Sequence, residues 1–495
     1  MTLVNLGYVN SRDDVAAIDP SLAPMVYLTE PGREGIFIWT AGDFSAKALI
    51  DWQRGMIIPS SIIAATQGAY VRFAIENRYN IRWFGAVPNG PDCASAFSIS
   101  IALLSEKGGE IYVPGGEWWV ASLLSIGNGD AGAAQSTRNA VKIVGEGAGF
   151  ASYSSAVPSI IKYVGTATTA YILDYLGRIC NCELHGILID CNSLCGGLRF
   201  TSISGCRVDG IKIINPASKT IALKIQGGNA PTGNYNIYNF FGRISINLKN
   251  PESIGLRMDG VIAASNDTWL SMFELVRIET VAGATKAVCA WLKFVDSISF
   301  HRCHFESSAE PTSFSLVLDA LDNDQFPAGI GFYDCSIDKV TVYEDANHKI
   351  RKCVFANHGT NDEEALPDHP MLVGYTDNGL WFGPFGYALG AGGSVTQQTS
   401  KSTTVTLDKP TGVITMHPAA IPAGAVVSFI LKNACITSAD TLTPNITGGG
   451  SYGAYHVGVS DVQNGVAVIS VRNMTGGSLA EAISIGFTLT KGAAA

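Results

Sequence analysis

The sequence predicts an all-β protein whose central part is a parallel β-helix, and three observations support this. Beyond Ala140 the chain breaks into short apolar runs, each ended by Gly, Asn or Asp, with no convincing long helix. Segments 182–190 and 206–214 match in their Cys, Gly and alternate Ile positions at an offset of 24 residues (206 minus 182), about one solenoid coil. Glycine makes up 54 of 495 residues and charged residues only 15%, which is typical of many turns and much buried surface.

Residues 1–80 are expected to form a small β-rich module. Apolar runs at 25–29, 35–39 and 68–72 are separated by turn-forming residues such as Pro31-Gly32. Short runs of this kind favour strands over a catalytic domain.

A helix is expected between Asp92 and Gly108, where apolar residues recur at helical spacing. Asp92 is a suitable N-cap and Gly108 a suitable C-cap. A strand follows at once over 110–120. This change of pattern begins the β-helix, which we predict over residues 81–375.

Three later segments, centred on Cys303, Cys335 and Cys353, share an apolar residue three positions before the cysteine and another two positions after it. Because equivalent positions of successive coils stack, this alignment predicts an interior ladder of the three cysteines. Their spacings of 32 (335 minus 303) and 18 (353 minus 335) residues are irregular, so we expect loops that bulge between coils. Chance matches in a β protein are the alternative. The register of the earlier segments is expected to continue at residues 242–246.

The eleven cysteines show no CxxC pairs and no zinc-finger spacing. We therefore expect most of them to be small buried apolar residues. No metal and no cofactor is predicted. His301, Cys303 and His304 are close in sequence, but adjacent positions on a strand point to opposite faces and cannot converge on one ion.

Residues 376–495 are predicted to form a linker and a C-terminal β-sandwich. The linker is rich in aromatic residues and glycine. Beyond it, alternating apolar runs predict five or more strands, among them 403–407, 412–416, 426–431, 466–471 and 483–489.

The charge pattern excludes two classes of partner. The net charge is −9, from 33 basic and 42 acidic residues, and no basic run occurs, so nucleic-acid binding is not expected. No stretch is long and apolar enough for membrane insertion, and the first residues lack the features of a signal peptide. We therefore expect a soluble protein, made in the cytoplasm, with a neutral or polar partner.

Two stretches, 81–120 and 141–165, resemble the opening of the pectate-lyase-like right-handed β-helix of bacteriophage tailspikes. The resemblance rests on Trp83-Phe-Gly-Ala, on Gly108-Gly-Glu-Ile-Tyr-Val-Pro-Gly and on Val141-Lys-Ile-Val-Gly-Glu-Gly-Ala-Gly. The loop after the first motif departs from the family's usual Gly-Asp-Gly and reads Pro-Asn-Gly-Pro-Asp-Cys.

Segments at both ends are also similar to modules of phage structural proteins, at 28–39, 411–417 and 471–479. The resemblance implies a homotrimer in the tail of the virion that binds, and often cleaves, bacterial surface polysaccharide. It also implies that the N-terminal module attaches to tail or baseplate proteins, and that the C-terminal module trimerises or binds glycan.

Outward-facing side chains in the later coils suggest a catalytic site. Hydrolysis of a glycoside needs two carboxylates across the scissile bond, and a lyase needs a base beside a uronate α-proton. If Cys303 points inward, then Arg302, His304 and Glu306 lie together on the outer face, because side chains alternate along a strand.

The same reasoning places Asp334 and Asp338 outward on the next Cys-aligned strand. Glu306 and Asp338 each lie three residues after their cysteine, so they stack if the two coils are neighbours. Such stacking would raise the pKa of one carboxyl, as a general acid requires. We predict Glu306 and Asp338 as a catalytic acid pair and His304, Arg302 and Asp334 as sugar-binding neighbours. The alternative is a set of solvated carboxylates.

A second set of acids lies among apolar residues upstream, with Glu274 as a further predicted catalytic residue. No repeat register in the sequence aligns the members of this set, which are Glu274, Glu279, Asp296 and Asp267. Trp269 is predicted to stack on a sugar ring, although core packing or a subunit contact would explain it equally well.

These observations favour a trimeric tailspike that recognises a cell-surface glycan and depolymerises it. Two other classes remain open, because the sequence contains acids but no diagnostic catalytic motif. One is a receptor-binding adhesin without chemistry, and the other is a structural component of the tail or baseplate.

Overall fold

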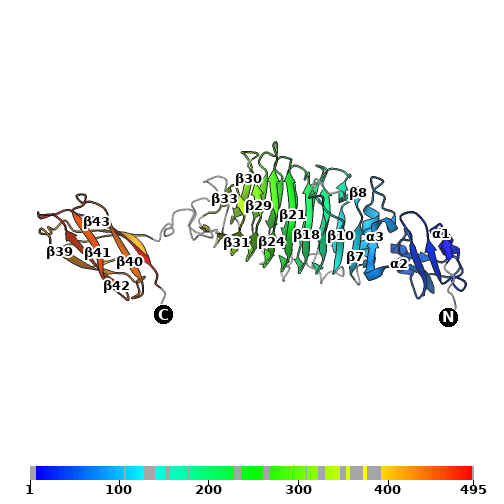
Figure 1. Cartoon of the computed structure of the whole chain (residues 1–495), viewed down its shortest axis with the longest axis horizontal. Coiled ribbons are helices and arrows are strands. Elements are labelled where there is room, and N and C mark those ends of the chain that lie inside the picture. The colour runs from blue at the N-terminus through cyan, green and yellow to red at the C-terminus, as the bar shows by residue number, and fades with distance from the viewer. Residues whose placement is uncertain are drawn as a thin grey trace. The chain divides into compact units, whose positions relative to one another are not determined.

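A computed structural model of the chain (Figure 1) describes residues 7–104, 108–127, 140–150, 157–176, 179–227, 236–259, 268–293, 295–307, 309–321, 329–345, 353–356, 372–375 and 392–492. The chain divides into two compact units, Met1–Phe382 and Gly383–Ala495. Among the described residues, no helix is long and apolar enough to cross a membrane.

The first unit begins with a five-stranded sheet in the order β1-β2-β3-β5-β4. The three expected apolar runs form its strands β2, β3 and β5, and a separate small core lies beneath them. The elements are β1 (Gly7–Val9), α1 (Arg12–Ala17), β2 (Met25–Leu28), β3 (Gly35–Ala41), α2 (Ser45–Ile50), β4 (Ile57–Pro59) and β5 (Gly68–Arg72).

A capped helix precedes the β-helix, as the sequence predicts. The helix α3 (Ala94–Leu104) follows two 3-10 turns, η1 (Ile75–Asn77) and η2 (Ile81–Phe84). The Asp92 carboxylate accepts the N–H of Ala94 at 2.9 Å, and Gly108, at φ 71°, donates its N–H to the Leu104 carbonyl at 2.9 Å. Buried apolar side chains of α3 join the core of the coils that follow.

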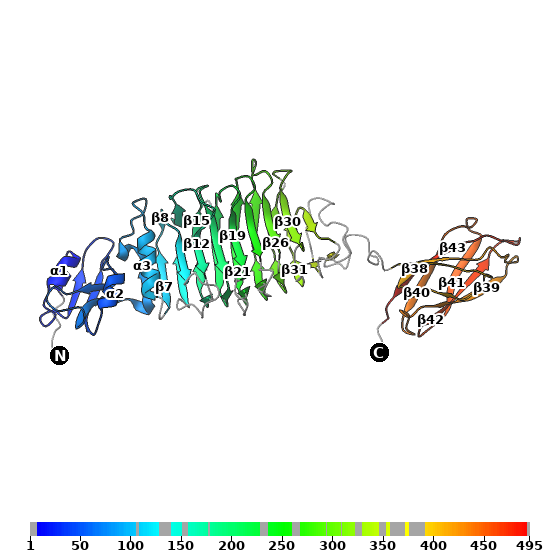
Figure 2. The same cartoon turned by 180° about the vertical axis from the view of Figure 1, so that it is seen from behind.

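The rest of the first unit is a parallel β-helix, seen from two opposite sides in Figures 1 and 2. Within the described residues, its main sheet has 17 strands. They are β6 (Arg78–Asn80), β7 (Gly109–Val113), β8 (Gly116–Val120), β10 (Val141–Gly145), β11 (Ser159–Tyr163), β14 (Glu183–His185), β15 (Ile187–Asp190), β18 (Arg207–Ile214), β21 (Phe240–Leu248), β24 (Met272–Glu274), β25 (Arg277–Thr280), β28 (Ser299–His301), β29 (His304–Glu306), β31 (Ile330–Tyr333), β32 (Ser336–Ile337), β34 (Cys353–Ala356) and β35 (Leu372–Tyr375).

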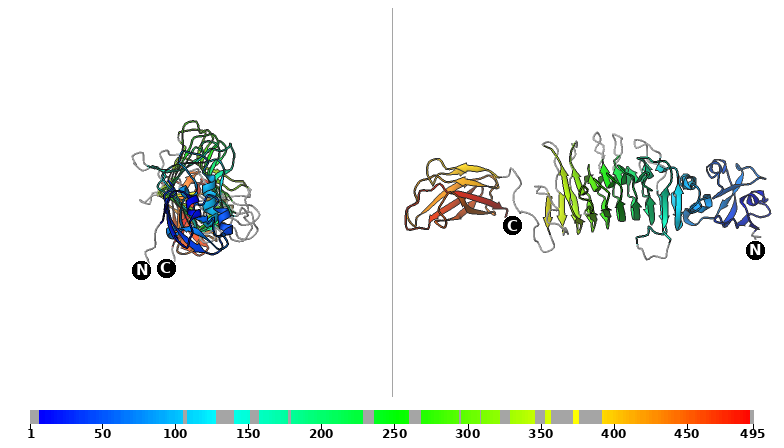
Figure 3. Two further views of the ribbon diagram at one scale, coloured as in Figure 1. Left: turned by 90° about the vertical axis from the view of Figure 1, so that its right-hand side faces the viewer. Right: turned by 90° about the horizontal axis from the view of Figure 1, so that it is seen from above.

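Two further sheets complete the coils, and Figure 3 shows their strands stacked along the solenoid. The eight-stranded sheet contains β9 (Leu124–Gly127), β12 (Tyr171–Leu176), β16 (Gly196–Thr201), β19 (Ile221–Gln226), β22 (Ile254–Asp259), β26 (Val288–Leu292), β30 (Phe314–Asp319) and β33 (Val340–Tyr343). The five-stranded sheet contains β13 (Ile179–Cys180), β17 (Ile203–Ser204), β20 (Asn236–Ile237), β23 (Thr268–Trp269) and β27 (Val295–Asp296).

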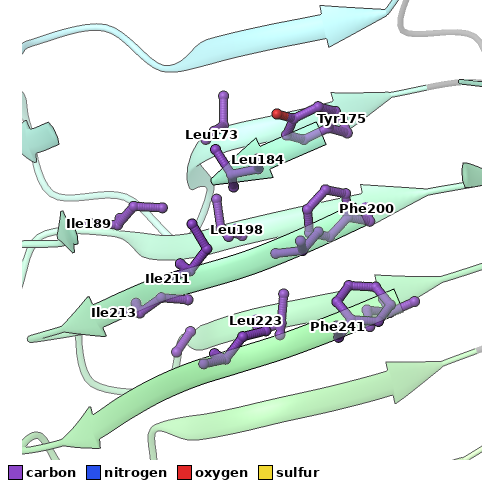
Figure 4. Packing of buried hydrophobic residues seen from close by; sticks show 14 of the residues in the cluster. Leu173, Tyr175, Leu184, Ile189, Leu198, Phe200, Ile211, Ile213, Leu223 and Phe241 are labelled. Atoms are coloured by element: carbon purple, nitrogen blue, oxygen red, sulfur yellow. The ribbon is translucent and has the colours of Figure 1, made fainter. Parts of the chain in front are cut away.

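The register confirms the 24-residue repeat. Glu183 pairs with Arg207 in parallel strands, and the same rows continue from Ile211 to Ile244 in β21. Apolar side chains of equivalent positions therefore stack inside the solenoid, as Leu198 and Leu223 do in the sheet opposite (Figure 4).

An uninterrupted stack of phenylalanine rings fills one edge of this interior. Neighbouring ring centroids lie 4.7, 4.7, 4.9 and 4.7 Å apart, close to the spacing of the strands that carry them. All five rings are fully buried, and they belong to Phe241, Phe273, Phe300, Phe332 and Phe355.

The main sheet bends two positions after each stacked phenylalanine, and two positions after the residues that take its place in earlier coils, Leu184 and Val208. In six successive coils the bend residue has a left-handed backbone, with φ between 46° and 66°. Glycine takes up this conformation without a steric penalty, whereas other residues rarely adopt it. The six residues are Gly186, Gly210, Arg243, Leu275, Arg302 and Asp334.

The cysteine prediction is confirmed for burial and partly wrong for register. Nine of the eleven cysteines are buried and all are free thiols. Cys303 and Cys335 occupy equivalent positions, because His304 pairs with Ser336. Cys353 instead pairs with Ile330, 23 residues earlier (353 minus 330) and before the bend. The pattern of an apolar residue three before and another two after the cysteine occurs on both sides of the bend. It therefore could not show that Cys353 lies before the bend, whereas Cys303 and Cys335 lie after it.

The second unit has its own core between two four-stranded sheets. All five predicted runs contribute strands. One sheet contains β36 (Ser394–Thr396), β38 (Thr411–Thr415), β43 (Ser484–Thr490) and β40 (Thr441–Gly448), and the other contains β37 (Val405–Thr406), β39 (Val426–Lys432), β42 (Val466–Asn473) and β41 (Tyr455–Gln463).

Candidate active site

Four successive coils of the main sheet share one local pattern, which begins at the stacked phenylalanine. Apolar residues occupy the third and fifth positions after it, and a carboxylate or amide occupies the sixth. Because the coils are in register, the sixth positions form one row on the outer face. This acidic row consists of Asn247, Glu279, Glu306 and Asp338.

Two carboxylates of the acidic row meet around one imidazole. Glu279 on β25 pairs in register with Glu306 on β29. The His304 Nε2 atom lies 3.0 Å from Glu306 Oε2 and 3.6 Å from Glu279 Oε1. One oxygen of each glutamate and a ring nitrogen of His304 all lie within 4.8 Å of one another. We call these three residues the acid–imidazole cluster.

The two glutamates differ in their surroundings. Glu279 forms an ion pair with Arg277 on its own strand, and its side chain is 16% exposed. The Glu306 side chain is 38% exposed and lies against His304. Phe305, between His304 and Glu306, points into the core, so its packing fixes the outward direction of both neighbours.

Arg302, His304 and Glu306 all face outward, as the alternation predicts. Arg302 occupies the bend and forms an ion pair with Glu274 of the preceding coil, so it does not join the acid–imidazole cluster. His301, on the same strand row as Glu274, stacks on Tyr333 with 4.9 Å between ring centroids.

The coils that carry Glu306 and Asp338 are direct neighbours, which is the condition for the two residues to stack. The Asp338 carboxylate, however, accepts the N–H of Ser307 at 3.0 Å, which turns it toward the backbone beyond Glu306. Asp334 lies exposed at the bend of the same coil. Asp338 therefore does not form the expected pair with Glu306. The carboxylate that approaches His304 from a neighbouring coil is that of Glu279, in the coil before.

The second predicted set is dispersed. Asp296 lies in β27 of the five-stranded sheet, away from Glu274 and Glu279 in the main sheet. Trp269 lies in β23, and its side chain is outside what the structure describes, as is Asp267.

The sequence interpretation placed Glu279 behind Glu306 and Asp338 and did not consider Arg277. The signal was present, because Phe273-Glu-Leu-Val-Arg-Ile-Glu and Phe300-His-Arg-Cys-His-Phe-Glu align without a gap. Aligning on cysteine hid this match, since Val276 takes the place of Cys303. Aligning on the phenylalanine reveals it.

The acid–imidazole cluster offers one nitrogen and two carboxylate oxygens, a donor set that can bind a divalent cation. These are not the three neighbouring residues considered from the sequence, of which only His304 belongs to this cluster. Without any ion, the same arrangement can transfer a proton between a carboxyl group and a bound substrate.

A second polar cluster lies on the same sheet, toward the N-terminal coils. The Asp209 carboxylate is buried and accepts N–H groups from Arg243 at 2.7 and 2.6 Å and from Arg207 at 3.1 Å. These hydrogen bonds, chiefly those from Arg243, hold the pKa of Asp209 below its usual range. The His185 ring lies 3.9 Å from the same carboxylate.

No protein-family model and no curated protein sequence matches the chain. Solved structures do resemble it. The tailspike protein gp49 of Acinetobacter baumannii bacteriophage Fri1, a capsular polysaccharide depolymerase, has a TM-score of 0.51 at 8% identity over 98% of both chains. The tailspike protein of Acinetobacter phage vB_ApiP_P1 has a TM-score of 0.46 at 13% identity over 99% of both chains.

Pantoea stewartii WceF, a glycan biofilm modifying enzyme with a tailspike-like β-helix, has a TM-score of 0.40 at 12% identity, over 98% of this chain and 71% of that one. At these identities the similarity concerns the fold. The chain has the parallel β-helix fold of phage tailspike proteins.

Proposed function

We propose that the chain is a phage tailspike that binds a bacterial surface polysaccharide and hydrolyses its glycosidic bonds. The observation that carries this proposal is the pair of carboxylates, Glu279 and Glu306, with oxygens within 4.8 Å on adjacent coils. Glycosidases that retain the anomeric configuration place two carboxyl groups about 5 to 5.5 Å apart. The pair therefore suits a double-displacement mechanism.

The surroundings of each glutamate suggest its role. Glu279, held by Arg277, would attack the anomeric carbon as a carboxylate. Glu306, more exposed and hydrogen-bonded to His304, would protonate the leaving oxygen. The bond from sugar to leaving group breaks as the bond from sugar to Glu279 forms. Glu306 then takes a proton from water, which hydrolyses the glycosyl ester and restores both groups.

The outer face of the main sheet would hold the polymer. Outward side chains recur about every 4.8 Å along the solenoid, so a repeating glycan can meet a regular series of groups. Glu274, Arg302 and Asp334 are then candidates for sugar contacts in the same coils as the catalytic pair, and Trp269 and Asp338 remain candidates at its margins.

The division into parts gives each a proposed task. Residues 1–80 would attach the protein to other tail or baseplate components, 81–375 would bind and cleave, and 376–495 would support a homotrimer or bind glycan. A trimeric mass by light scattering is expected, and a monomeric mass at micromolar concentration would contradict this assembly.

The catalytic assignment can be tested with purified capsular polysaccharides and a reducing-end assay. The double variant Glu279→Gln/Glu306→Gln should lose at least about a hundredfold in cleavage while it still binds the polymer. The matched control is Glu252→Gln, which breaks an exposed ion pair with Lys219 and should cleave normally. Full cleavage by the double variant would reject the assignment. Binding by the wild-type protein without release of fragments would instead support an adhesin.

A further inference from the structure

The cluster around Asp209 has more positive than negative charge. Two guanidinium groups, of Arg207 and Arg243, converge on one carboxylate. The nearby Glu183 forms an ion pair with Lys142 at 2.8 Å. In the part of the chain that the structure describes, no other carboxylate forms an ion pair with either arginine. Among the described residues, the cluster therefore keeps one positive charge in excess.

The two arginines are held in place yet reach solvent. Asp209 is buried, with a side chain 4% exposed, whereas the side chains of Arg207 and Arg243 are 59% and 56% exposed. Arg207 also lies over the Phe240 ring, 5.1 Å from its centroid. A guanidinium carries five N–H donors, and Asp209 receives two from Arg243 and one from Arg207. The remaining donors have a fixed orientation.

The backbone of the bend does not itself require an arginine. Arg243 has a left-handed backbone at φ 46°, in the row where the two preceding coils place Gly186 and Gly210. The conformation is unfavourable for a residue with a side chain, and the hydrogen bonds from Arg243 to the buried Asp209 carboxylate offset part of this cost. The three following coils also place residues with side chains there, Leu275, Arg302 and Asp334. Recognition of a ligand gives a reason for the arginine at this place.

The position of the cluster relates it to the proposed catalytic pair. Arg243 lies on β21, and β21 pairs directly with β25, which carries Glu279. Arg243 lies four positions before Asn247, the residue that pairs with Glu279, and Arg207 lies one coil further, opposite Phe240. A polymer that contacts Glu279 and Arg243 would therefore cross the sheet obliquely, over one strand spacing of about 4.8 Å and about four residues of strand at roughly 3.3 Å each.

We infer that the polysaccharide is anionic and that Arg207 and Arg243 bind one of its carboxylate or phosphate groups. Planar guanidinium groups bind both through paired hydrogen bonds. This inference rests on the proposed function and specifies the substrate class. Asp209 acts as the positioning residue that orients the two arginines.

The experiment uses the full-length protein and a panel of purified bacterial polysaccharides that contain uronate or phosphate, together with neutral ones. Each anionic polymer is paired with its carboxyl-reduced or dephosphorylated form, and binding is measured at two salt concentrations. The neutralised form should bind about tenfold more weakly or worse. Which treatment weakens binding distinguishes carboxylate from phosphate.

The double variant Arg207→Gln/Arg243→Gln should lose the same factor toward the anionic form and nothing toward the neutralised form. Arg54→Gln is the matched control, because Arg54 also pairs with an aspartate, Asp13, on the surface of the N-terminal module. Binding restored by Arg→Lys at both positions would show that positive charge suffices, which still supports the anionic ligand.

The inference is overturned if wild-type protein binds only neutral polymers, or if neutralisation leaves its affinity unchanged. It is also overturned if the double variant keeps its preference for the anionic form. Failure to bind any polymer in the panel would reject the proposed function itself, so the two failures are distinguishable.

Discussion

The inner and outer faces of the same strands follow different rules. At the inner face, β21, β24, β28 and β31 all carry phenylalanine at the equivalent position. One residue later the side chain faces outward, and the residue differs in each coil: Gly242, Glu274, His301 and Tyr333. The buried residue is thus the same in all four coils, whereas the residue next to it differs in each.

The difference separates two kinds of constraint. These four coils offer a similar interior space, so the same side chain satisfies it each time. The two preceding coils place the smaller Leu184 and Val208 in this row. The outer positions meet solvent or ligand, and nothing in the packing requires them to match. Outer positions whose residue changes from coil to coil are therefore candidates for recognition, as where Arg243 follows Gly186 and Gly210 in the bend row. The acidic row is a candidate for a different reason, because it repeats a carboxylate or amide in four coils at a position that core packing does not specify.

Removing a ring from the inner stack should have the largest effect. Phe300→Ala is expected to lower the free energy of unfolding by about 3 to 5 kcal/mol, because the cavity lies between Phe273 and Phe332, whose rings are 4.7 and 4.9 Å away. Guanidinium unfolding measures the loss. Phe73→Ala, at a ring 59% exposed, should change stability by less than about 0.5 kcal/mol. Equal losses would show that the inner stack does not dominate.

Neutralising the buried carboxylate of the outer face should have an intermediate effect. Asp209→Asn is expected to cost about 2 kcal/mol at neutral pH, because charge-assisted hydrogen bonds from Arg207 and Arg243 are lost. The folded-state pKa of Asp209 lies below its unfolded value of about 3.9. Its contribution is therefore present above that value and is lost as the pH falls through the folded pKa.

The pH dependence gives this prediction its control. Unfolding free energies of wild type and variant should differ at neutral pH and converge in acid. A difference that stays constant down to the acid limit would mean that the variant acts through packing and not through charge.

The smallest effect is expected at the bend. Gly210→Ala should cost about 1 to 2 kcal/mol from its left-handed backbone alone, because the added methyl would meet no atom closer than 3.6 Å. Gly476→Ala is the control, since that glycine has neither a positive φ nor an atom within 4 Å of the added methyl. An unchanged unfolding midpoint for Gly210→Ala would show that the bend accepts side chains without cost. The presence of Arg243 and Leu275 at this position in later coils does not show this, because their cost is not measured.

Much of the fold could be predicted because it repeats. The match between residues 182–190 and 206–214 gave coil length and register, and alternation around Cys303 gave the outward direction of His304 and Glu306. These inferences needed only the period of a strand and the stacking of equivalent positions.

The candidate site was harder because it depends on which coils are adjacent. Coil lengths vary, so the partner of Glu306 on each side depends on loops whose length carries no register information. Alignment of the segments on Cys303 and Cys335 indicated Asp338 in the following coil. Finding Glu279 in the preceding coil requires alignment on Phe273 and Phe300 instead. The contact of Asp338 with the Ser307 N–H is a matter of side-chain rotamer, which no sequence pattern specifies.

The phenylalanine stack also bears on how such a protein can diversify. Because the rings stack coil on coil, duplication or deletion of one whole coil within the stack would leave each remaining ring beside another phenylalanine of the stack. The distance between outer groups on either side of the change would shift by about 4.8 Å. Recombination could thus alter the spacing of the groups that the proposed function assigns to a polymer, in discrete steps, while the phenylalanine stack stays intact.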